Sequence, residues 1–376
     1  MTNIQCSRVI GHYIVIRPDQ KYKNKSLVCL FVMQKRSQSR RSFVKLAAGV
    51  GTVGSVGLAG CMGSGEEAEG AIDLLTPEGN LNIMHFLAGT DEGFWADEGL
   101  TFNPEVAAYG RFANALPGGN DVGLLEYNNL AQYTQEGEEF VQFGPCITQI
   151  NSIFVPVDSD IETVEDLQGI RFGHPGWSTG TGTYTQAMIW EQYDFDIREE
   201  NESINSDPAT LYDLMVEQDE VDAMLQFTGQ TVRGLANSED VRPVYNAWEE
   251  WEAETGYPPL ITPWCAQRSW LEENYETALA LVEGWGSAQQ HIEANAEAVV
   301  SEYGQLAGVG EGDQDAVIEL AESGSLHLPI DEYTDALIDS QWRLVEAMAD
   351  LGSIEAVPPR EDHVISIDEL RAEASD

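Results

Sequence analysis

The feature that most constrains the fold is an alternation, from residue 81 onward, of short apolar runs with longer segments of helical period. The runs that read as strands lie at 81–88, 102–107, 121–125, 152–157, 169–173 and 221–226. The helical patterns lie at 91–99, 128–135, 181–193 and 208–217, and the chain is mostly helical after Trp270. Strands that alternate with helices favour parallel pairing. The sequence therefore predicts an α/β fold with mainly parallel sheets flanked by helices.

The length of the chain bounds the number of domains. About 316 residues follow Gly60, which suits two domains of ordinary size. Residues 61–80 are rich in Gly, Glu and Ser, so we expect a flexible tether before the first domain. Residues 110–120 are too short and too rich in glycine and proline for the helix that the alternation requires there. The structure of this corner stays open.

An export signal occupies residues 33–60. The pair Arg40-Arg41 precedes Phe43 and a small-residue apolar core, which is typical of twin-arginine signals. The core is too short to cross a bilayer of ~30 Å as a permanent helix. It ends in Leu-Ala-Gly before Cys61, a lipobox in which the cysteine is lipidated. The alternative is a chance arginine pair before a buried helix. The order and spacing of the two motifs predict a lipoprotein at the outer face of the cell membrane.

Residues 1–32 precede a segment that would itself be a normal signal start. Met33 begins the run Met-Gln-Lys-Arg-Ser-Gln-Ser-Arg-Arg. We therefore expect translation to begin at Met33, with residues 1–32 outside the protein.

The charge of the chain changes sharply at the end of the signal. Residues 1–60 hold ten of the 19 basic residues and one of the 64 acidic ones. The remainder carries nine arginines, no lysine and 63 dispersed acidic residues. This composition resembles the style of haloarchaeal proteins. In ~1 M salt the Debye length is only ~3 Å, so the charge hardly repels an anionic ligand. It argues against nucleic acid binding.

Four short motifs occur in an order found in one family of receptors. They are Leu81-Asn82-Ile83 with Gly93-Phe94-Trp95 and Glu98-Gly99-Leu100, Asp121-Val122-Gly123, the segment 153–173, and Glu220-Val221-Asp222-Ala223. Together they resemble the nitrate/sulfonate/taurine-type (SsuA/NMT1-like) solute-binding proteins of ABC importers. The resemblance covers residues 81–350 and departs from the family at 110–120 and in the acidic insertion 246–257.

The resemblance implies a two-lobed, periplasmic-binding-protein-like (type II) fold. Lobe 1 would comprise 81–150 and 270–372, and lobe 2 would comprise 151–269. It also implies a monomeric receptor that captures a small-molecule ligand between the lobes and delivers it to the permease and ATPase subunits of an importer. The membrane would be contacted through the lipid anchor alone.

Candidate ligand-binding residues follow from the predicted strand exits, because open α/β sheets bind ligands at the carboxyl ends of their strands. The residues at these exits and at the return crossover are Thr90, Asp91, Glu126, Tyr127, Asn128, Trp177, Ser178, Thr179, Gly180, Thr181, Phe227, Thr228 and Trp264.

The segment 177–183 offers the most binding features. Ser178 and Thr179 are good N-caps, and Gly180 lets a ligand approach free backbone N–H groups. The alternative is a capped helix without a ligand. The rings of Trp177, Tyr127 and Trp264 could stack on a planar ligand, and packing in the core is the alternative for each.

Catalytic and metal-binding patterns are missing from the sequence. No His-Glu-x-x-His, cysteine cluster or Gly-x-Ser-x-Gly occurs after the signal. We expect a binding protein without cofactor or metal, and a small organic anion or planar heterocycle as its ligand. One alternative is an enzyme of the thiamine-pyrimidine synthase-like branch, whose cysteine-rich motif has no match here. Another is a binding module for a membrane sensor.

The two remaining cysteines, Cys146 and Cys265, fall near the expected crossings between the lobes. Adjacent strands lie ~4.7–4.9 Å apart, so a disulfide is possible outside the cell. The alternative is two separate buried thiols.

Overall fold

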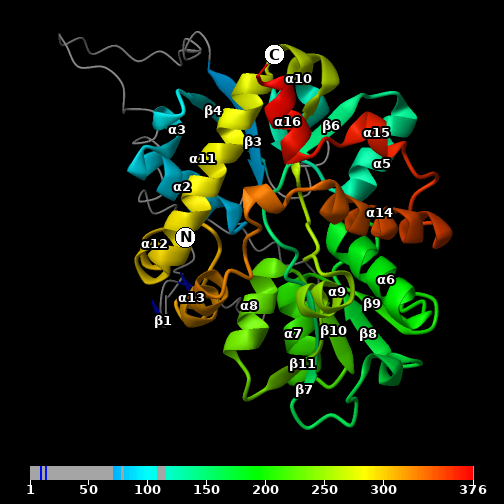
Figure 1. Cartoon of the computed structure of the whole chain (residues 1–376). Coiled ribbons are helices and arrows are strands. Elements are labelled where there is room, and N and C mark those ends of the chain that lie inside the picture. The colour runs from blue at the N-terminus through cyan, green and yellow to red at the C-terminus, as the bar shows by residue number, and fades with distance from the viewer. Residues whose placement is uncertain (1–8, 11–12, 15–70, 78–79, 108–115, 376) are drawn as a thin grey trace, which may run out of the picture. The chain divides into compact units, whose positions relative to one another are not determined.

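The structure is a computed structural model, and it describes residues 9–10, 13–14, 71–77, 80–107 and 116–375 (Figure 1). Arg40, Arg41 and Cys61 lie outside the described residues. The chain divides into Met1–Cys61, in which β1 (Val9–Ile10) pairs with β2 (Tyr13–Ile14), and Met62–Asp376. Among the described helices, none is both long and apolar enough to cross a bilayer.

The second part contains two five-stranded sheets. The first has the order β4-β3-β5-β12-β6. Its strands are β3 (Ile72–Pro77), β4 (Phe102–Ala107), β5 (Val122–Leu124), β6 (Phe140–Gly144) and β12 (Trp264–Gln267). The second has the order β11-β7-β10-β8-β9. Its strands are β7 (Ser152–Pro156), β8 (Arg171–His174), β9 (Glu202–Asn205), β10 (Ala223–Gln226) and β11 (Val241–Asn246).

The α/β class and the mainly parallel sheets are as predicted, and each sheet is mixed because one of its five strands runs antiparallel to the other four. Strand β3 is parallel to β4 and β5, whereas β12 is antiparallel to β5 and β6. Likewise β10 and β9 are parallel to β8, whereas β7 is antiparallel to β10 and β11. The antiparallel strands β7 and β12 directly follow the two chain crossings, so each enters its new sheet from the opposite end.

Helices surround both sheets (Figure 1). The α-helices are α2 (Asn82–Glu92), α3 (Phe94–Asp97), α5 (Tyr127–Glu136), α6 (Gly180–Tyr193), α7 (Pro208–Val216), α8 (Thr228–Ala236), α9 (Ala247–Thr255), α10 (Arg268–Glu273), α11 (Tyr275–Ala294), α12 (Ala296–Tyr303), α13 (Gln314–Glu322), α14 (Asp335–Asp350), α15 (Arg360–His363) and α16 (Ile367–Glu373). Three 3₁₀ turns are η1 (Leu116–Gly118), η2 (Val164–Leu167) and η3 (Ile330–Glu332).

The sequence prediction was wrong at the start of the first sheet. The first strand is β3, which lies in the range predicted to be a tether, and the predicted strand 81–88 is the first part of α2. Leu81, Met84 and Ala88 share one face of that helix and pack in one buried cluster. A short apolar run cannot be assigned to strand or helix by periodicity alone, and here the buried helical face was read as a strand.

The two crossings between the sheets run side by side. Gln149 N donates to Pro259 O (2.8 Å) and Ile261 N donates to Ile147 O (3.4 Å). The amide of Gln341 on α14 accepts from Leu260 N (2.8 Å) and donates to Pro258 O (3.1 Å). Strand β12 belongs to the first sheet although it lies within the range expected for lobe 2. The lobe boundaries given by the resemblance otherwise stay a prediction.

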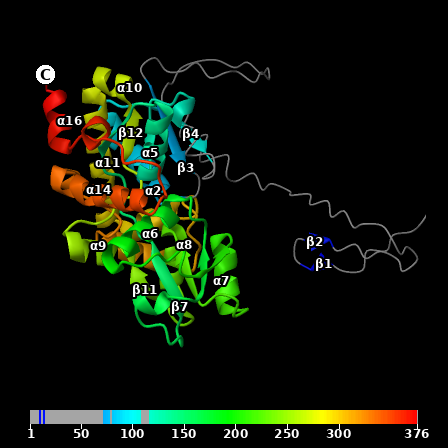
Figure 2. The same ribbon diagram turned by 90° about the vertical axis from the view of Figure 1, so that its right-hand side faces the viewer.

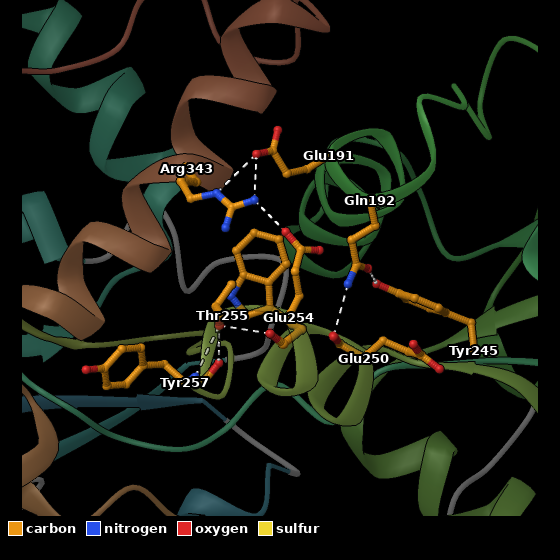
Figure 3. A network of polar contacts seen from close by, with 9 residues as sticks. Glu191, Gln192, Tyr245, Glu250, Glu254, Thr255, Tyr257 and Arg343 are labelled. Atoms are coloured by element: carbon orange, nitrogen blue, oxygen red, sulfur yellow. Dashed lines mark hydrogen bonds and ion pairs between the residues drawn. The ribbon is translucent and has the colours of Figure 1, made fainter.

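Helix α14 also contacts the second sheet's helices (Figures 1 and 2). Arg343 donates to Glu191 of α6 (2.8 Å) and to Glu254 of α9 (2.6 Å), and its guanidinium lies 5.2 Å from the ring centroid of Trp251 (Figure 3). Gln192 of α6 extends this network to α9 by donating to Glu250 O (3.1 Å). A helix that contacts both the crossing and the second sheet's helices limits how the two sheets can rotate.

Cys146 and Cys265 are two separate buried thiols, so the possible disulfide is not formed and the alternative to it holds. Cys265 lies within β12, whereas Cys146 lies beyond the end of β6, with its carbonyl accepting from Trp285 Nε1 (2.9 Å). Burial raises the pKa of both thiols well above the usual value. Because the thiolate is the reactive form, oxidation of either is disfavoured.

Trp285 is one of the largest fully buried side chains in this part of the core. It is fully buried, donates to Cys146 O, and packs edge-to-face on Trp264 with ring centroids 5.1 Å apart. We expect Trp285→Ala to lower the free energy of unfolding by about 3–5 kcal/mol, since a large cavity replaces the ring. Denaturant unfolding in high salt would measure this. Trp270→Ala, at a half-buried position on α10, is the control, and an equal loss there would contradict the assignment.

Candidate functional site

The candidate site lies where strand exits of the two sheets meet. Glu126 follows β5 and is the N-cap residue of α5, but its side chain makes no cap hydrogen bond to that helix. Its carboxylate instead lies against Gly180, the first residue of α6 on the second sheet. A Cβ added at Gly180 would fall 2.2 Å from Glu126 Oε1. A side chain at this position would therefore have to displace the Glu126 carboxylate.

Thr179 prepares the N-terminus of α6 for this contact. Its Oγ1 accepts from Gly182 N (3.2 Å) and thereby caps the helix, as predicted. Gly180 and Thr181 are buried, while Ser178 is exposed. Helix N-termini favour negative charge, so a carboxylate at this position is electrostatically stabilised.

A second connection reaches the return crossing. Tyr127 N, in the first turn of α5, donates to Tyr184 OH of α6 (2.7 Å), which in turn donates to Ile261 O (3.2 Å). The Tyr127 ring is fully buried beside Trp342 and Tyr184, with centroid distances of 6.1 and 5.9 Å. The backbone of Tyr127 therefore lies at the site, whereas its ring packs in the core.

Trp177 and Trp264 also pack against protein groups. The Trp177 ring stacks on His174 at 4.3 Å, and its Nε1 donates to Ser203 Oγ (2.8 Å), so one ring face is covered. Trp264 is fully buried and packs edge-to-face on Phe86. Contact of either ring with a ligand stays a prediction.

The remaining predicted residues divide into two groups. Phe227 and Thr228 lie at the exit of β10, at the same sheet edge as the exit of β8, because these two strands are parallel neighbours. Asn128 follows Tyr127 in the first turn of α5. Thr90 and Asp91 instead lie at the C-terminal end of α2, where Asp91 accepts from Tyr303 OH (2.6 Å). Their proposed place at a strand exit was wrong, since no strand precedes them there.

Three buried amide side chains were not predicted as site residues. In the described part of the chain, both side-chain polar atoms of Asn82, Gln149 and Asn151 are buried and have no hydrogen-bond partner. Asn82 begins α2, and the other two flank Ile150 in the first crossing; Ile150 packs in one cluster with Leu81 and Ile83. Buried polar groups are normally paired. A ligand or water beside these side chains would supply the missing hydrogen-bond partners. In the sequence, the polar residues within the apolar run 146–153 were the available sign of a polar site here.

His85 lies on the same helix. Its ring stacks on Trp285 at 4.5 Å and meets His327 edge-on at 4.8 Å. Burial, and then the neighbouring His327, lower the pKa of His85 well below its usual value. The ring is therefore neutral at pH 7, and it can donate one hydrogen bond and accept another but supplies no charge. Within the described residues, no group of three or more His, Cys, Asp or Glu side chains could hold a metal ion.

His174 supports the segment before α6 and gives a pH test of its geometry. Its Nδ1 accepts from Gly176 N (3.1 Å), and its Nε2 contacts Ser203 Oγ (2.8 Å). Burial, with a smaller effect of Arg198, lowers the pKa of His174 to about 4. An unfolded histidine titrates near 6.5. Between these pH values the unfolded chain binds a proton that the folded chain does not, so this residue lowers stability as the pH falls from about 6.5 to about 4.

We therefore expect the stability advantage of the wild type over His174→Gln to be constant above pH 7 and to shrink between pH 6.5 and 4. Denaturant unfolding at fixed salt would measure both proteins across this range. His291→Gln, on α11, is the control. Parallel pH profiles for the wild type and His174→Gln would contradict the neutral, buried imidazole.

Comparisons with solved structures identify the fold. The periplasmic aliphatic sulphonate-binding protein SsuA from Escherichia coli matches with a TM-score of 0.62 and 14% identity, over 79% of this chain and 92% of that chain. The alkanesulfonate-binding protein SsuA from Xanthomonas axonopodis pv. citri, bound to MOPS, gives 0.58 and 12%, over 80% and 97%. The periplasmic nitrate-binding protein NrtA from Synechocystis PCC 6803 gives 0.57 and 10%, over 81% and 88%. The fold is therefore that of the periplasmic binding proteins.

Sequence comparison adds the family. No curated protein matches the chain. The model of the NMT1/THI5-like family matches residues 80–298, more than half of the chain. The chain therefore belongs to the NMT1/THI5-like family.

Proposed function

We propose that the chain is the solute-binding lipoprotein of an ABC importer, which captures its ligand between two lobes. The observation that supports this most is the contact of Glu126 with Gly180, since it brings strand exits of two separate sheets together. The unpaired amides of Asn82, Gln149 and Asn151 add donors and acceptors near the first crossing. The two paired crossings form the hinge about which the lobes would close on a ligand.

The ligand that fits this proposal is a small organic anion or a planar heterocycle. Sulfonate and nitrate are named for the structural relatives, and amide side chains can bond either kind of molecule. Ligand binding would stabilise the closed arrangement over the open one, and delivery to the permease would follow closure. The partners would be the permease and ATPase subunits, and the receptor would act as a monomer.

An enzyme of the thiamine-pyrimidine synthase-like branch is the alternative, because the family includes such a branch. Beyond Cys61, the only cysteines after the signal are Cys146 and Cys265, so the branch's cysteine-rich motif has no counterpart. Adjacent permease and ATPase genes would favour transport over both this alternative and a sensor module. Chemical conversion of a bound ligand would favour the enzyme.

A screen in high salt tests ligand capture. We expect one class among nitrate, sulfonates, bicarbonate, aromatic acids and pyrimidines to raise the melting temperature, because a ligand at 100 times its Kd adds about 2.7 kcal/mol of stability. No shift with any class would contradict the receptor proposal.

Asn151→Leu is the matched variant for this screen. Replacing an unpaired buried amide by an apolar side chain of similar size loses no hydrogen bond in the free protein. We expect the free variant to melt at or above the wild-type temperature and to lose the ligand-induced rise. A variant that melts early yet keeps the rise would place the binding site elsewhere.

The location at the outer membrane face rests on Arg40, Arg41 and Cys61. We expect Arg40→Lys with Arg41→Lys to hold the precursor in the cytoplasm, because the twin-arginine receptor reads both guanidinium groups. Cys61→Ser should release the protein from the membrane or leave its signal uncleaved, since the lipid acceptor is lost. Fractionation and immunoblotting would measure both. Unchanged membrane attachment of Cys61→Ser would show that the lipobox assignment is wrong.

A further inference from the structure

The amides of Asn82, Gln149 and Asn151 are fully buried and offer both kinds of hydrogen-bonding group. Each side chain has a carbonyl oxygen that accepts and an NH₂ group that donates. In the described part of the chain, none of these six atoms has a partner. Buried polar groups are normally paired, and an unpaired one costs stability. The three side chains therefore indicate a bound molecule that carries donors as well as acceptors.

Contacts of Trp285 place the start of the first crossing beside α2. Asn82 and His85 lie three positions apart on α2, so their side chains share one face of the helix. The His85 ring stacks on Trp285 with centroids 4.5 Å apart, and Trp285 Nε1 donates to Cys146 O (2.9 Å). Cys146 precedes Gln149 by three residues in the first crossing. The helix face that carries one unpaired amide is thus joined to the segment that carries another.

A second set of contacts joins the same two elements. The His85 ring meets His327 edge-on at 4.8 Å. The residue before it, Leu326, accepts from Thr148 N (3.2 Å) through its carbonyl. Thr148 directly precedes Gln149, and its own Oγ1 is also buried without a partner. Two independent contacts therefore place the first crossing beside His85, and the unpaired amides of α2 and of the crossing lie in neighbouring parts of the fold.

The charged side chains decide which kind of molecule fits these amides. No lysine follows the signal, and Arg111 lies outside the described residues. Each described arginine after the signal already contacts a carboxylate or a backbone carbonyl; these are Arg171, Arg198, Arg233, Arg242, Arg268, Arg343, Arg360 and Arg371. His85 is neutral, because burial and then His327 lower its pKa well below the usual value. No Asp or Glu is among the buried unpaired groups of the described chain.

We propose that the amides of Asn82, Gln149 and Asn151 select a neutral ligand group of the carboxamide, urea or lactam type. Such a group donates to the amide oxygens and accepts from the amide NH₂ groups. A carboxylate only accepts and an amidinium only donates, so either would leave part of the amide atoms unpaired. Either charge would also leave water without a counter-charge. This inference rests on the proposed function, because it names the ligand class of the same site.

Two sets of isosteric probes test the charge of the ligand. One set is benzamide, benzoate and benzamidinium, and the other is acetamide, acetate and acetamidinium. The members of a set have nearly the same shape and differ in charge. We expect the wild type to bind at least one amide about tenfold or more tightly than the carboxylate and the amidinium of its set, a difference of about 1.4 kcal/mol. Titration calorimetry and thermal shift at one high salt concentration would measure this.

Gln149→Leu tests the place of binding. It removes an unpaired amide and keeps a similar volume, so the free variant should melt at or above the wild-type temperature and bind the amide at least tenfold more weakly. Asn82→Leu should weaken binding in the same way, which guards against a fault peculiar to the crossing. Gln218→Leu is the matched control, because it makes the same change at an exposed amide, and it should bind as the wild type does.

Three results would overturn the proposal. A carboxylate or amidinium that binds as tightly as its amide would show that the site does not select neutral groups. Unchanged amide binding by Gln149→Leu and Asn82→Leu would place the ligand elsewhere. Failure of both amides to bind would mean that water alone pairs these side chains. The receptor function survives each of these results if a class in the screen above shifts the wild type, and it fails separately if neither that screen nor any probe does.

Discussion

The pairing of the two crossings is the interaction on which the rest of the structure depends. Residues 147–149 and 259–261 bond to each other through their backbones, and Gln341 occupies an N–H and a carbonyl of the second crossing from the side. Gln341 is fully buried, so loss of these two bonds would leave polar groups unpaired in the core. The two crossings therefore form one paired segment between the sheets.

Helix α14 links this hinge to both sheets through three consecutive residues. Gln341 bonds the crossing, Trp342 packs edge-on against Tyr127 at 6.1 Å, and Arg343 bridges Glu191 and Glu254 on the second sheet's helices (Figure 3). Adjacent helical positions point in directions about 100° apart. One turn of helix therefore contacts the hinge, the core beneath the site and the second sheet's helices. A rotation of the sheets must change at least one of these contacts.

The sequence predicted elements well where burial and periodicity agree. Strand β4 (Phe102–Ala107) has the predicted bounds, and α6 begins within one residue of its predicted start. The prediction of a strand at 81–88 was wrong, because α2 is a helix with one buried face and its apolar run is as short as that of a strand. The sequence did not show which strand of each sheet runs antiparallel to the others, because strand direction depends on where the chain re-enters a sheet and leaves no local pattern.

For the site, topology was predictable and side-chain direction was not. Strand-exit reasoning placed Glu126 and Gly180 on facing elements, and a close contact joins them. The same reasoning favoured Tyr127 and Trp264 as ligand contacts, yet both rings point into the core. Whether a ring at a strand exit turns inward depends on space left by distant residues, such as Trp342 beside Tyr127 and Trp285 beside Trp264. The buried amides of the first crossing were not predicted either, because the side chains that pack around this segment belong to α2 and not to neighbouring residues in the sequence.

The abundance of acidic residues makes the placement of each charge more informative, not less. Several arginines bridge two carboxylates: Arg171 contacts Asp219 and Asp222, Arg343 contacts Glu191 and Glu254, and Arg360 contacts Asp335 and Asp339. These pairs are partly exposed, and exposed pairs contribute little because water and salt weaken them. A surface of this kind can gain or lose carboxylates with small energetic effect. Glu126 differs from these surface carboxylates because it is buried, and its carboxylate lies against Gly180 at the start of α6.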